Sequence, residues 1–451
     1  MRAALVLIGF TAVIAQIVLM RELIVVFYGN EVSLGLMLAV WLLWTAFGSG
    51  VLGRLFTTAR GSRRVVAGLE ALVAAAFPLT IFAVRASRRL FQAVPGEMLG
   101  PVPMFLTALV ALSLFCALSG WLFAAGSRLY ATETGASTAG ATGSVYLLEA
   151  IGSGAGGLLA GLVLIRYLDA FDIAALVGSL NLLAAAALAL PARYYAVAGA
   201  ALVLFPFAAH RLEAISLAQL WHGFQLVETR NSVYGNLAVT RTEDNLTVFE
   251  NGLAVFHVPD PDAAEEAVHY ALLEHPAPRN VLLIGGGVNG SLAQALQHPA
   301  IERLDYVELD PAILELARRH FPLHADSRVH IHNMDGRLFV KTTPRTFDVI
   351  IVNLPDPQTA QLNRFYTLEF FREAARRLKP SGVFSFGLSA SENYISPELA
   401  DFLRCINRTL REVFPDVVMI PGDTVHFFAA TRPGILVSDA AGLLARLRKN
   451  S

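Results

Sequence analysis

The stretch that decides the fold of the second half of the chain is Asn280-Val-Leu-Leu-Ile-Gly-Gly-Gly-Val-Asn-Gly290. Its apolar run predicts a buried parallel strand, and its glycines predict a tight turn whose backbone can approach a ligand. Ser291–Gln297 then opens a helix, and the N-terminus of a helix presents free N–H groups. The next predicted strand, Arg303–Glu308, ends in an acid 18 residues after Gly290. An acid at about this spacing binds ribose hydroxyls, so the whole unit predicts a nucleoside site.

Two further strands extend this pattern toward the C-terminus. Val329–Asn333 leads into Asp335-Gly336, and Phe347–Asn353 leads into Leu354-Pro-Asp-Pro357. Ligands bind at the carboxyl ends of the strands in open α/β sheets. We therefore expect one set of residues to converge on a single crevice: Gly285, Gly286, Gly287, Glu308, Leu309, Asp335, Gly336, Asn353 and Asp356. A single nucleoside fits this layout, with its adenine near Asp335, its ribose on Glu308 and its tail over the glycines.

The charged residues are unevenly distributed along the chain. Residues 1–220 carry 13 Arg, no Lys and 9 acidic residues, which makes 22 of 220 positions charged, whereas residues 221–451 carry 49 charged positions of 231. A soluble globular protein has about 25% charged residues, so only the second part resembles one. The net charge is −1 and no basic block exists, which argues against a nucleic-acid partner. Cys116 and Cys405 lie in different halves, so neither a disulfide framework nor a cysteine-based zinc site is expected.

Long apolar runs recur in the first part of the chain. Most reach the roughly 20 residues that span a bilayer core, and several in series predict a multi-pass membrane domain. The fifth run is rich in glycine, including Gly152, Gly154 and Gly161, which predicts close helix packing in lipid. The runs are Ala3–Met20, Val32–Leu52, Val65–Ala83, Val102–Ala125, Val145–Ile165, Ile173–Leu190 and Ala196–Ala209.

The number and orientation of the spans stay open at this point. The first run is interrupted by Arg21-Glu22 and the last is short, so six, seven or eight spans fit the pattern. The strongest basic loop contains Arg54, Arg60, Arg63 and Arg64, and a basic loop is expected on the cytoplasmic side. With the N-terminus inside, seven spans would put the second half of the chain outside. Cellular nucleosides are made in the cytoplasm, which favours the opposite placement.

A small β-rich region separates the two parts. Ser232–Val239 and Leu246–Gly252 read as short strands with an Asn-Gly turn, and Ala263–Leu273 reads as helical. Later strands are expected at Gly382–Phe386 and His426–Ala430. The predicted division is a multi-pass helical domain over 1–215, a small β-region over 216–262, an α/β domain over 263–435 and a C-terminal tail or helix over 436–451.

These residues resemble the spermidine synthase (polyamine aminopropyltransferase) family over roughly residues 225–430. The motifs that carry the resemblance are Gly285-Gly-Gly-Val-Asn-Gly290, Glu308, Asp335-Gly336 and Asn353-Leu-Pro-Asp-Pro357. The whole chain is similar to bacterial proteins in which several membrane helices precede a spermidine synthase-like domain. The resemblance implies a Rossmann-type, S-adenosylmethionine methyltransferase-like fold and often a homodimer. It also implies transfer of an aminopropyl group from decarboxylated S-adenosylmethionine to an amine such as putrescine, without a metal.

The sequence departs from the family pattern where the amine would bind. Val288 replaces the aspartate of the family's glycine motif, and Asn353 replaces the aspartate expected to act as base. An asparagine cannot accept a proton at neutral pH, which leaves Asp356, with Glu265 or Glu266 as a stand-in. The family's glutamine falls near Val255 and its tyrosine near Ala263 or Ala264. The nucleoside half is kept, through Glu308 for the ribose and Asp335 for the adenine amino group.

The stretch Gln361–Thr367 follows at the position where the family places a loop over the acceptor. We expect the acceptor pocket to include Tyr234, Glu265, Asn363, Arg364 and Tyr366. An arginine in this position suits an acidic or phosphate-bearing acceptor better than a polyamine. The alternative interpretation is a helix N-terminus in which Thr367 caps Leu368–Arg377. Both interpretations can hold together.

Three functional hypotheses follow. The first is a membrane-anchored aminopropyltransferase that uses Asp356 as its acid or base and acts on a small amine. The second is a methyltransferase, because loss of the carboxylate at Val288 lets ordinary S-adenosylmethionine enter. The third is a membrane transport or assembly protein whose second half senses a nucleoside without chemistry, since the membrane part is larger than an anchor needs. In each case the expected location is the bacterial inner membrane with the α/β domain in the cytoplasm.

Overall fold

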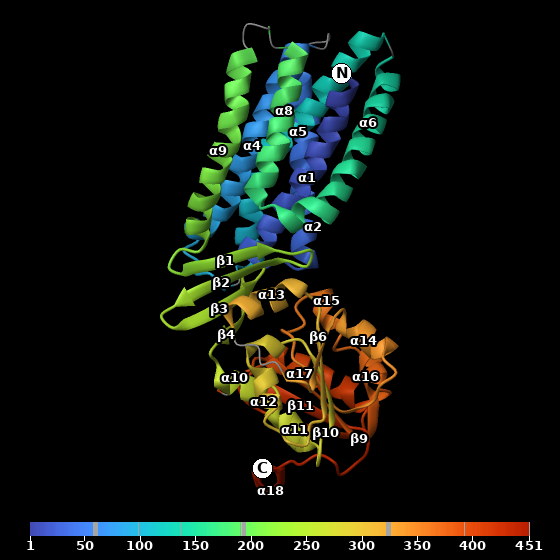
Figure 1. The fold of residues 1–451 in the computed structure, drawn as a ribbon. Coiled ribbons are helices and arrows are strands. Elements are labelled where there is room, and N and C mark those ends of the chain that lie inside the picture. The colour runs from blue at the N-terminus through green and yellow to red at the C-terminus, as the bar shows by residue number, and fades with distance from the viewer. Residues whose placement is uncertain are drawn as a thin grey trace. The chain divides into compact units, whose positions relative to one another are not determined.

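The chain forms two compact units in the computed structural model, which describes residues 1–56, 62–97, 99–135, 137–189, 191, 195–321, 326–391 and 393–450. The first, called the helical unit below, comprises Met1–Thr242 with Val248–Ala254. The second, called the α/β unit, comprises Glu243–Thr247 with Val255–Ser451. Figure 1 shows the helices of the first unit and the mixed helices and strands of the second.

Over the described residues, the helical unit contains seven helices long and apolar enough to cross a membrane. They correspond to the seven apolar runs of the sequence, and Arg60 of the basic loop lies outside the described residues. Two of the seven pass through a single π-helical turn, at Gly48–Leu52 and at Ala160–Leu164. The helical segments are α1 (Arg2–Phe27), α2 (Glu31–Phe47), α3 (Gly53–Phe56), α4 (Arg63–Leu90), α5 (Pro101–Thr134), α6 (Thr138–Leu159), α7 (Ile165–Tyr167), α8 (Ala170–Ala189) and α9 (Tyr195–Leu220).

Glycines let α1 and α6 approach at backbone distance. A Cβ atom on Gly152 would lie 1.9 Å from the carbonyl oxygen of Val6, and one on Gly9 would lie 2.0 Å from that of Glu149. Any larger residue would push the helices apart, as in small-residue packing within membranes. The close packing predicted from the glycines of the fifth run is confirmed for Gly152, whereas Gly154 has no neighbour within 4 Å.

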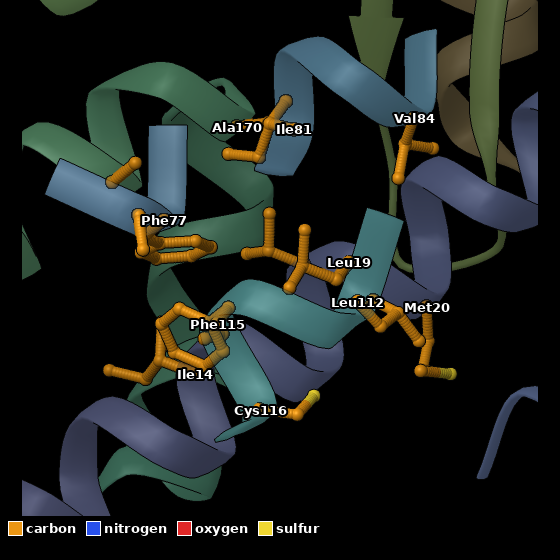
Figure 2. Close-up of a cluster of buried hydrophobic side chains, with 14 of the residues drawn as sticks. Ile14, Leu19, Met20, Phe77, Ile81, Val84, Leu112, Phe115, Cys116 and Ala170 are labelled. Atoms are coloured by element: carbon orange, nitrogen blue, oxygen red, sulfur yellow. The ribbon is translucent and has the colours of Figure 1, made fainter. Parts of the chain in front are cut away.

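An apolar core joins α1, α4, α5 and α8 in the helical unit. Figure 2 shows its side chains, among them Phe77 of α4 and Phe115 of α5, whose ring centroids lie 5.5 Å apart. Ile14 and Leu112 are fully buried in the same cluster. The core is therefore continuous across helices that are far apart in the sequence.

A four-stranded sheet in the order β1-β2-β3-β4 follows α9. Its strands are β1 (Gln225–Asn231), β2 (Asn236–Thr242), β3 (Asn245–Glu250) and β4 (Leu253–Val258). The predicted Asn-Gly turn is confirmed: Asn251 and Gly252 connect β3 to β4 with positive φ values of 50° and 83°. The division of the chain at 215, 262 and 435 stays a prediction, since α9 continues to Leu220 and the small sheet occupies 225–258.

The α/β unit is built on a seven-stranded sheet in the order β10-β11-β9-β8-β5-β6-β7. β5 pairs in parallel with β6 on one side and with β8 on the other, so the strand order reverses at β5 and β8. A reversal of this kind marks the ligand crevice of doubly wound folds. The strands are β5 (Asn280–Ile284), β6 (Arg303–Glu308), β7 (Val329–Asn333), β8 (Phe347–Val352), β9 (Leu378–Ser389), β10 (Asp416–Ile420) and β11 (Thr424–Ala430).

Helices and an aromatic core support this sheet. Phe371 and Phe386 stack with centroids 5.9 Å apart, and Phe384 stacks on Phe414 at 5.8 Å. Together with the strand order, this confirms the Rossmann-type fold expected from the sequence. The helices are α10 (Pro261–Glu266), α11 (His269–Glu274), α12 (Ser291–Ala295), α13 (Pro311–His320), α14 (Gly336–Thr342), α15 (Ala360–Asn363), α16 (Leu368–Ala375), α17 (Pro397–Arg411) and α18 (Ala440–Asn450), with Ser451 outside the described residues.

Candidate functional site

The parallel register brings the predicted nucleoside residues to one edge of the sheet. Ile284 at the end of β5 pairs with Val307 of β6 and with Val352 of β8, and Glu308 pairs with Asn333 of β7. The residues that follow these positions are the glycine turn, Leu309, Asp335 and Asn353. They lie at the carboxyl ends of adjacent strands, where open α/β sheets bind ligands.

The glycine turn fits between its neighbours only because it carries no side chains. Gly285 and Gly286 have φ values of 74° and 64°, in the left-handed region that glycine adopts without Cβ strain. A Cβ atom on Gly286 would lie 2.2 Å from Nδ2 of Asn353. A Cβ atom on Gly287 would lie 2.6 Å from the ring of Tyr306. The glycines therefore set the geometry of the crevice as well as leaving the backbone open to a ligand.

Glu308 is a buried carboxyl group at the end of β6. It is 7% exposed, and its Oε2 accepts a hydrogen bond of 2.7 Å from the hydroxyl group of Tyr306. The backbone N–H of Asp310 donates to Oε1 at 3.3 Å. Burial raises the pKa of Glu308, and these two hydrogen bonds oppose the rise. The backbone of Leu309 contributes a third hydrogen bond. A carboxylate has about four acceptor positions, so this one can still bind a hydroxyl group of a ribose.

Asp335 and Arg364, which the sequence assigned to the nucleoside and acceptor halves, form an ion pair. Oδ1 of Asp335 accepts a hydrogen bond of 2.8 Å from the backbone of Leu338 and so caps α14. Oδ2 pairs with the guanidinium of Arg364, which also lies 5.0 Å from the ring centroid of Phe365. Arg364 directly follows α15, whose end presents the guanidinium to Asp335. In this structure the two halves of the predicted site therefore meet through opposite charges.

Two buried polar atoms near the end of β8 have no hydrogen-bond partner among the described residues: Nδ2 of Asn353 and the hydroxyl oxygen of Tyr366. Burial and the negative charge of Asp356 both raise the pKa of Tyr366. Asp356 itself accepts a hydrogen bond of 3.0 Å from the backbone of Ser389 at the end of β9. Unpartnered buried polar atoms are rare and need an explanation. Both atoms lie at the ligand edge, where a bound polar ligand would supply hydrogen-bond partners.

The remaining predicted acceptor residues are more scattered. Asn363 ends α15 and is exposed, while Tyr366 is 3% exposed. Glu265 lies on α10 and is also exposed. Tyr234 belongs to the helical unit, in the turn between β1 and β2, where its backbone N–H donates to the Ser232 hydroxyl at 3.0 Å. Thr367 caps α16 through a 3.4 Å bond from Phe370, which confirms the predicted cap.

Two residues of this region, Tyr306 and His426, were not predicted from the sequence. Tyr306 supplies the hydroxyl group on Glu308, but a tyrosine inside an apolar strand carries no signal of that role. His426 pairs with Gly387 near the end of β9, is 8% exposed, and has Nε2 at 3.7 Å from the carboxylate of Glu266. Burial lowers the pKa of His426, and the charge of Glu266 opposes this. Its location follows from the antiparallel β9–β11 register, which no local motif records.

Comparison with known proteins agrees with this geometry. Residues 263–426 match the spermine/spermidine synthase domain family. A polyamine aminopropyltransferase of Moorella thermoacetica is 34% identical over 197 residues, which cover 42% of this chain and 68% of that protein. That of Mycobacterium tuberculosis is 33% identical over 272 residues, covering 55% and 52%. A crystal structure of spermidine synthase from Thermotoga maritima matches with 22% identity, 50% and 78% coverage and a TM-score of 0.42.

The fold and the residues at its carboxyl edge define a Rossmann-type domain of the spermidine synthase kind. The chain belongs to the polyamine aminopropyltransferase (spermidine synthase) family. It spans about a third to a half of the length of several curated relatives that it matches, such as 35% for that of Oceanobacillus iheyensis.

Proposed function

We propose that the α/β unit transfers an aminopropyl group from decarboxylated S-adenosylmethionine to a small amine. The observation that carries this proposal is the arrangement of Glu308, Asp335 and the glycine turn at one edge of the sheet. Glu308 would hold the ribose and Asp335 the adenine amino group. The unpartnered polar atoms of Asn353 and Tyr366 lie where the reacting tail and the acceptor would meet.

The reaction requires a neutral amine and a group that takes its proton. The amine nitrogen attacks the carbon next to the sulfonium; a C–N bond forms, the C–S bond breaks, and methylthioadenosine leaves with the electron pair. The proton lost by the amine passes to a general base. Asp356 is the carboxylate that the family motif retains here, and its Oδ1 accepts a hydrogen bond from the backbone of Ser389. Asn353 can donate through Nδ2 but cannot take the proton.

A second candidate, methyl transfer from ordinary S-adenosylmethionine, is favoured by one observation. Val288 lies in the glycine turn, is 6% exposed, and puts an apolar group where a carboxylate would repel the cofactor's own carboxylate. Without that repulsion, ordinary S-adenosylmethionine would be tolerated. In this case a nucleophilic atom of the acceptor attacks the methyl carbon, a bond to the methyl group forms as the carbon–sulfur bond breaks, and S-adenosylhomocysteine leaves with the electron pair.

Product analysis separates these functions. The full chain, purified in detergent, is incubated with putrescine and either form of the cofactor. Methylthioadenosine, formed by the wild type and at least tenfold less by Asp356→Asn, is the expected result. S-adenosylhomocysteine would establish methyl transfer instead. Binding without either product would refute catalysis and favour nucleoside sensing.

We further propose that the helical unit holds the chain in the bacterial inner membrane, with the α/β unit in the cytoplasm and a second copy as partner. Seven helices of sufficient length and apolarity among the described residues support the membrane part of this proposal. A reporter fused after Ser451 should be active in the cytoplasm. A periplasmic signal would contradict the orientation.

A further inference from the structure

One end of the helical unit contains a polar cavity of about 280 Å³. Its lining residues come mainly from the ends of α1, α4 and α9, from the segment 165–169 and from β1. Figure 1 shows these helix ends and β1. This volume is just below the range of about 300–1,000 Å³ that is usual for small-molecule sites. Its charged lining residues are Glu22, Arg85, Arg166, Asp169, Glu213 and Arg230. A cavity lined by so many ionisable groups is unexpected in a bundle of apolar helices.

Arg85 lies at the centre of these charges and is only 5% exposed. Its guanidinium binds the carboxylate of Glu22 in a bidentate manner, at 2.6 and 3.0 Å. A third nitrogen lies 3.0 Å from Oε1 of Glu213 and also donates to the hydroxyl of Ser216 at 2.9 Å. The group therefore brings two carboxylates to one guanidinium, drawn from α1, α4 and α9.

Glu213 is left incompletely satisfied by this arrangement. It is 8% exposed, and its Oε2 has no hydrogen-bond partner among the described residues. Asp169 adds a third carboxylate to the cavity wall. The other two arginines of the lining are more exposed, and the guanidinium of Arg166 lies 5.8 Å from the ring centroid of Tyr167. The buried charges of the cavity are therefore those of Glu22, Glu213 and Arg85, which leaves one negative charge in excess. The partly buried Asp169 and Arg230 add one charge of each sign.

A purely structural ion group does not account for this excess. Buried charges are tolerated when each is paired and every polar atom is hydrogen-bonded. Here one carboxylate oxygen of Glu213, a residue of the cavity lining, has no hydrogen-bond partner among the described residues. No group of three His, Cys, Asp or Glu residues with metal-binding geometry occurs in the described part of the chain, which disfavours a divalent metal. An ammonium group supplies three N–H donors and a positive charge, and indole rings such as that of Trp221 on the cavity wall attract such cations.

We propose that this cavity is a binding site for a small aliphatic amine, whose ammonium group binds Glu213 and Asp169. The choice of an amine rests in part on the proposed function, which gives the α/β unit an amine substrate. The site gives the helical unit a role beyond anchoring, because it binds the same class of molecule that the α/β unit uses. Binding in the cavity does not itself require group transfer.

Equilibrium binding of radiolabelled putrescine and spermidine to the full chain in lipid nanodiscs tests the proposal. Glu213→Gln keeps the size of the side chain and an oxygen for Arg85 but removes the charge, and it should weaken amine binding at least tenfold. Glu133→Gln, which removes an exposed carboxylate from the same unit, is the matched control and should leave binding unchanged. Asp169→Asn keeps the cap on α8, since the amide oxygen can still accept from Asp172, and should also weaken binding.

The outcomes separate this site from the site of group transfer. Glu213→Gln should still form product at saturating amine, whereas Asp356→Asn should lose product and keep the cavity affinity. If the wild type transfers no aminopropyl group but its amine binding is still weakened by Glu213→Gln, the proposed function is refuted and the cavity proposal stands. Amine binding that is insensitive to both Glu213→Gln and Asp169→Asn would overturn the cavity proposal. Displacement of the amine by sodium or potassium at equal concentration would do the same.

Discussion

Two buried tyrosines of the α/β unit provide an internally controlled test of how the site is stabilised. Tyr306 is fully buried, and its hydroxyl group donates 2.7 Å to Glu308. Tyr366 is 3% exposed, and its hydroxyl has no partner among the described residues. Changing either to phenylalanine removes one oxygen and leaves the ring in place. The Tyr306 hydroxyl also has a hydrogen bond with the backbone of Gly287, so Tyr306→Phe removes a satisfied hydroxyl group and Tyr366→Phe an unsatisfied one.

The expected free-energy changes have opposite signs. A hydrogen bond to a charged group contributes about 1.5–3 kcal/mol, so Tyr306→Phe should lower the stability of the unit by about 2 kcal/mol. Removing an unsatisfied buried hydroxyl is neutral or favourable, so Tyr366→Phe should gain up to about 1 kcal/mol. Tyr366→Phe should nevertheless reduce product formation, because that hydroxyl lies where the acceptor would bind.

The loss in Tyr306→Phe should also depend on pH. The hydrogen bond from Tyr306 lowers the pKa of Glu308, while burial raises it. Removing the bond therefore raises this pKa further above its unfolded value. A raised carboxyl pKa means that the folded state holds a proton that the unfolded state has released, so stability falls as the pH rises. The difference between Tyr306→Phe and the wild type should be larger at pH 8 than at pH 5.

Hydrogen–deuterium exchange of peptides that contain β6 is the suitable assay. All four tryptophans lie in the helical unit, so their fluorescence does not follow this sheet. A loss of about 2 kcal/mol corresponds to roughly 30-fold faster exchange. Equal effects of the two variants, or a Tyr306→Phe effect that does not change with pH, would refute the role given to the Tyr306–Glu308 bond.

Three other predictions concern the same unit. Gly286→Ala should abolish nucleoside binding, measured by calorimetry, because its Cβ would collide with Asn353, the residue after β8. The control Gly434→Ala has a similar φ of 77° but no neighbour within 4 Å, so it should bind normally and lose only about 1–2 kcal/mol of stability. Burial lowers the pKa of His298 to about 4, so between about pH 6.5 and pH 4 only the unfolded state binds the proton. The free energy of unfolding, measured with denaturant, should therefore fall as the pH drops through this range, and His298→Gln should flatten that dependence. Arg364 competes with the nucleoside for Asp335, so Arg364→Gln should strengthen nucleoside binding. The gain should be less than tenfold, since a partly exposed ion pair contributes about 0–1 kcal/mol. Weaker binding would show instead that this arginine contacts the ligand.

The strands of the α/β unit could largely be predicted because parallel strands buried on both faces are continuous apolar runs. The predicted Arg303–Glu308 agrees with the buried β6. Val329–Asn333 agrees with β7 although this strand lies at the sheet edge and alternates apolar residues with histidine. Two strands were not predicted from the sequence. β10 (Asp416–Ile420) is a short strand at the sheet edge, and β1 (Gln225–Asn231) contains many polar residues. Edge strands bury less apolar surface, so their sequences carry a weaker signal.

The residues at the ligand edge of the sheet could be predicted from the sequence, but the contacts between their side chains could not. Parallel register alone aligns the residues that follow β5, β6 and β8, and each of these could be named from its own strand. The pair between Asp335 and Arg364 depends on the direction in which α15 ends, which no spacing rule records. His426 reaches the same region through an antiparallel strand from the C-terminal part of the chain.

The buried charges of the helical unit show the same limit. In the sequence, Glu22 is recognisable only as part of the Arg21-Glu22 interruption of the first apolar run. In the structure it binds Arg85, 63 positions later, and the same guanidinium also binds Glu213 of α9. Each residue by itself is an isolated charge in an apolar run. Only the packing of α1, α4 and α9 makes them one group.

Calorimetric titration of methylthioadenosine into the full chain is the most direct test of the nucleoside site, which is the central claim. This nucleoside has neither the aminopropyl group nor a carboxylate, so its binding does not depend on which group is transferred. The account predicts saturable binding by the wild type and at least tenfold weaker binding by Asp335→Ala. It predicts unchanged binding by Asp326→Ala, which removes a partly exposed carboxylate paired with Arg328 just before β7. No binding by the wild type, or equal affinity in Asp335→Ala, would contradict it.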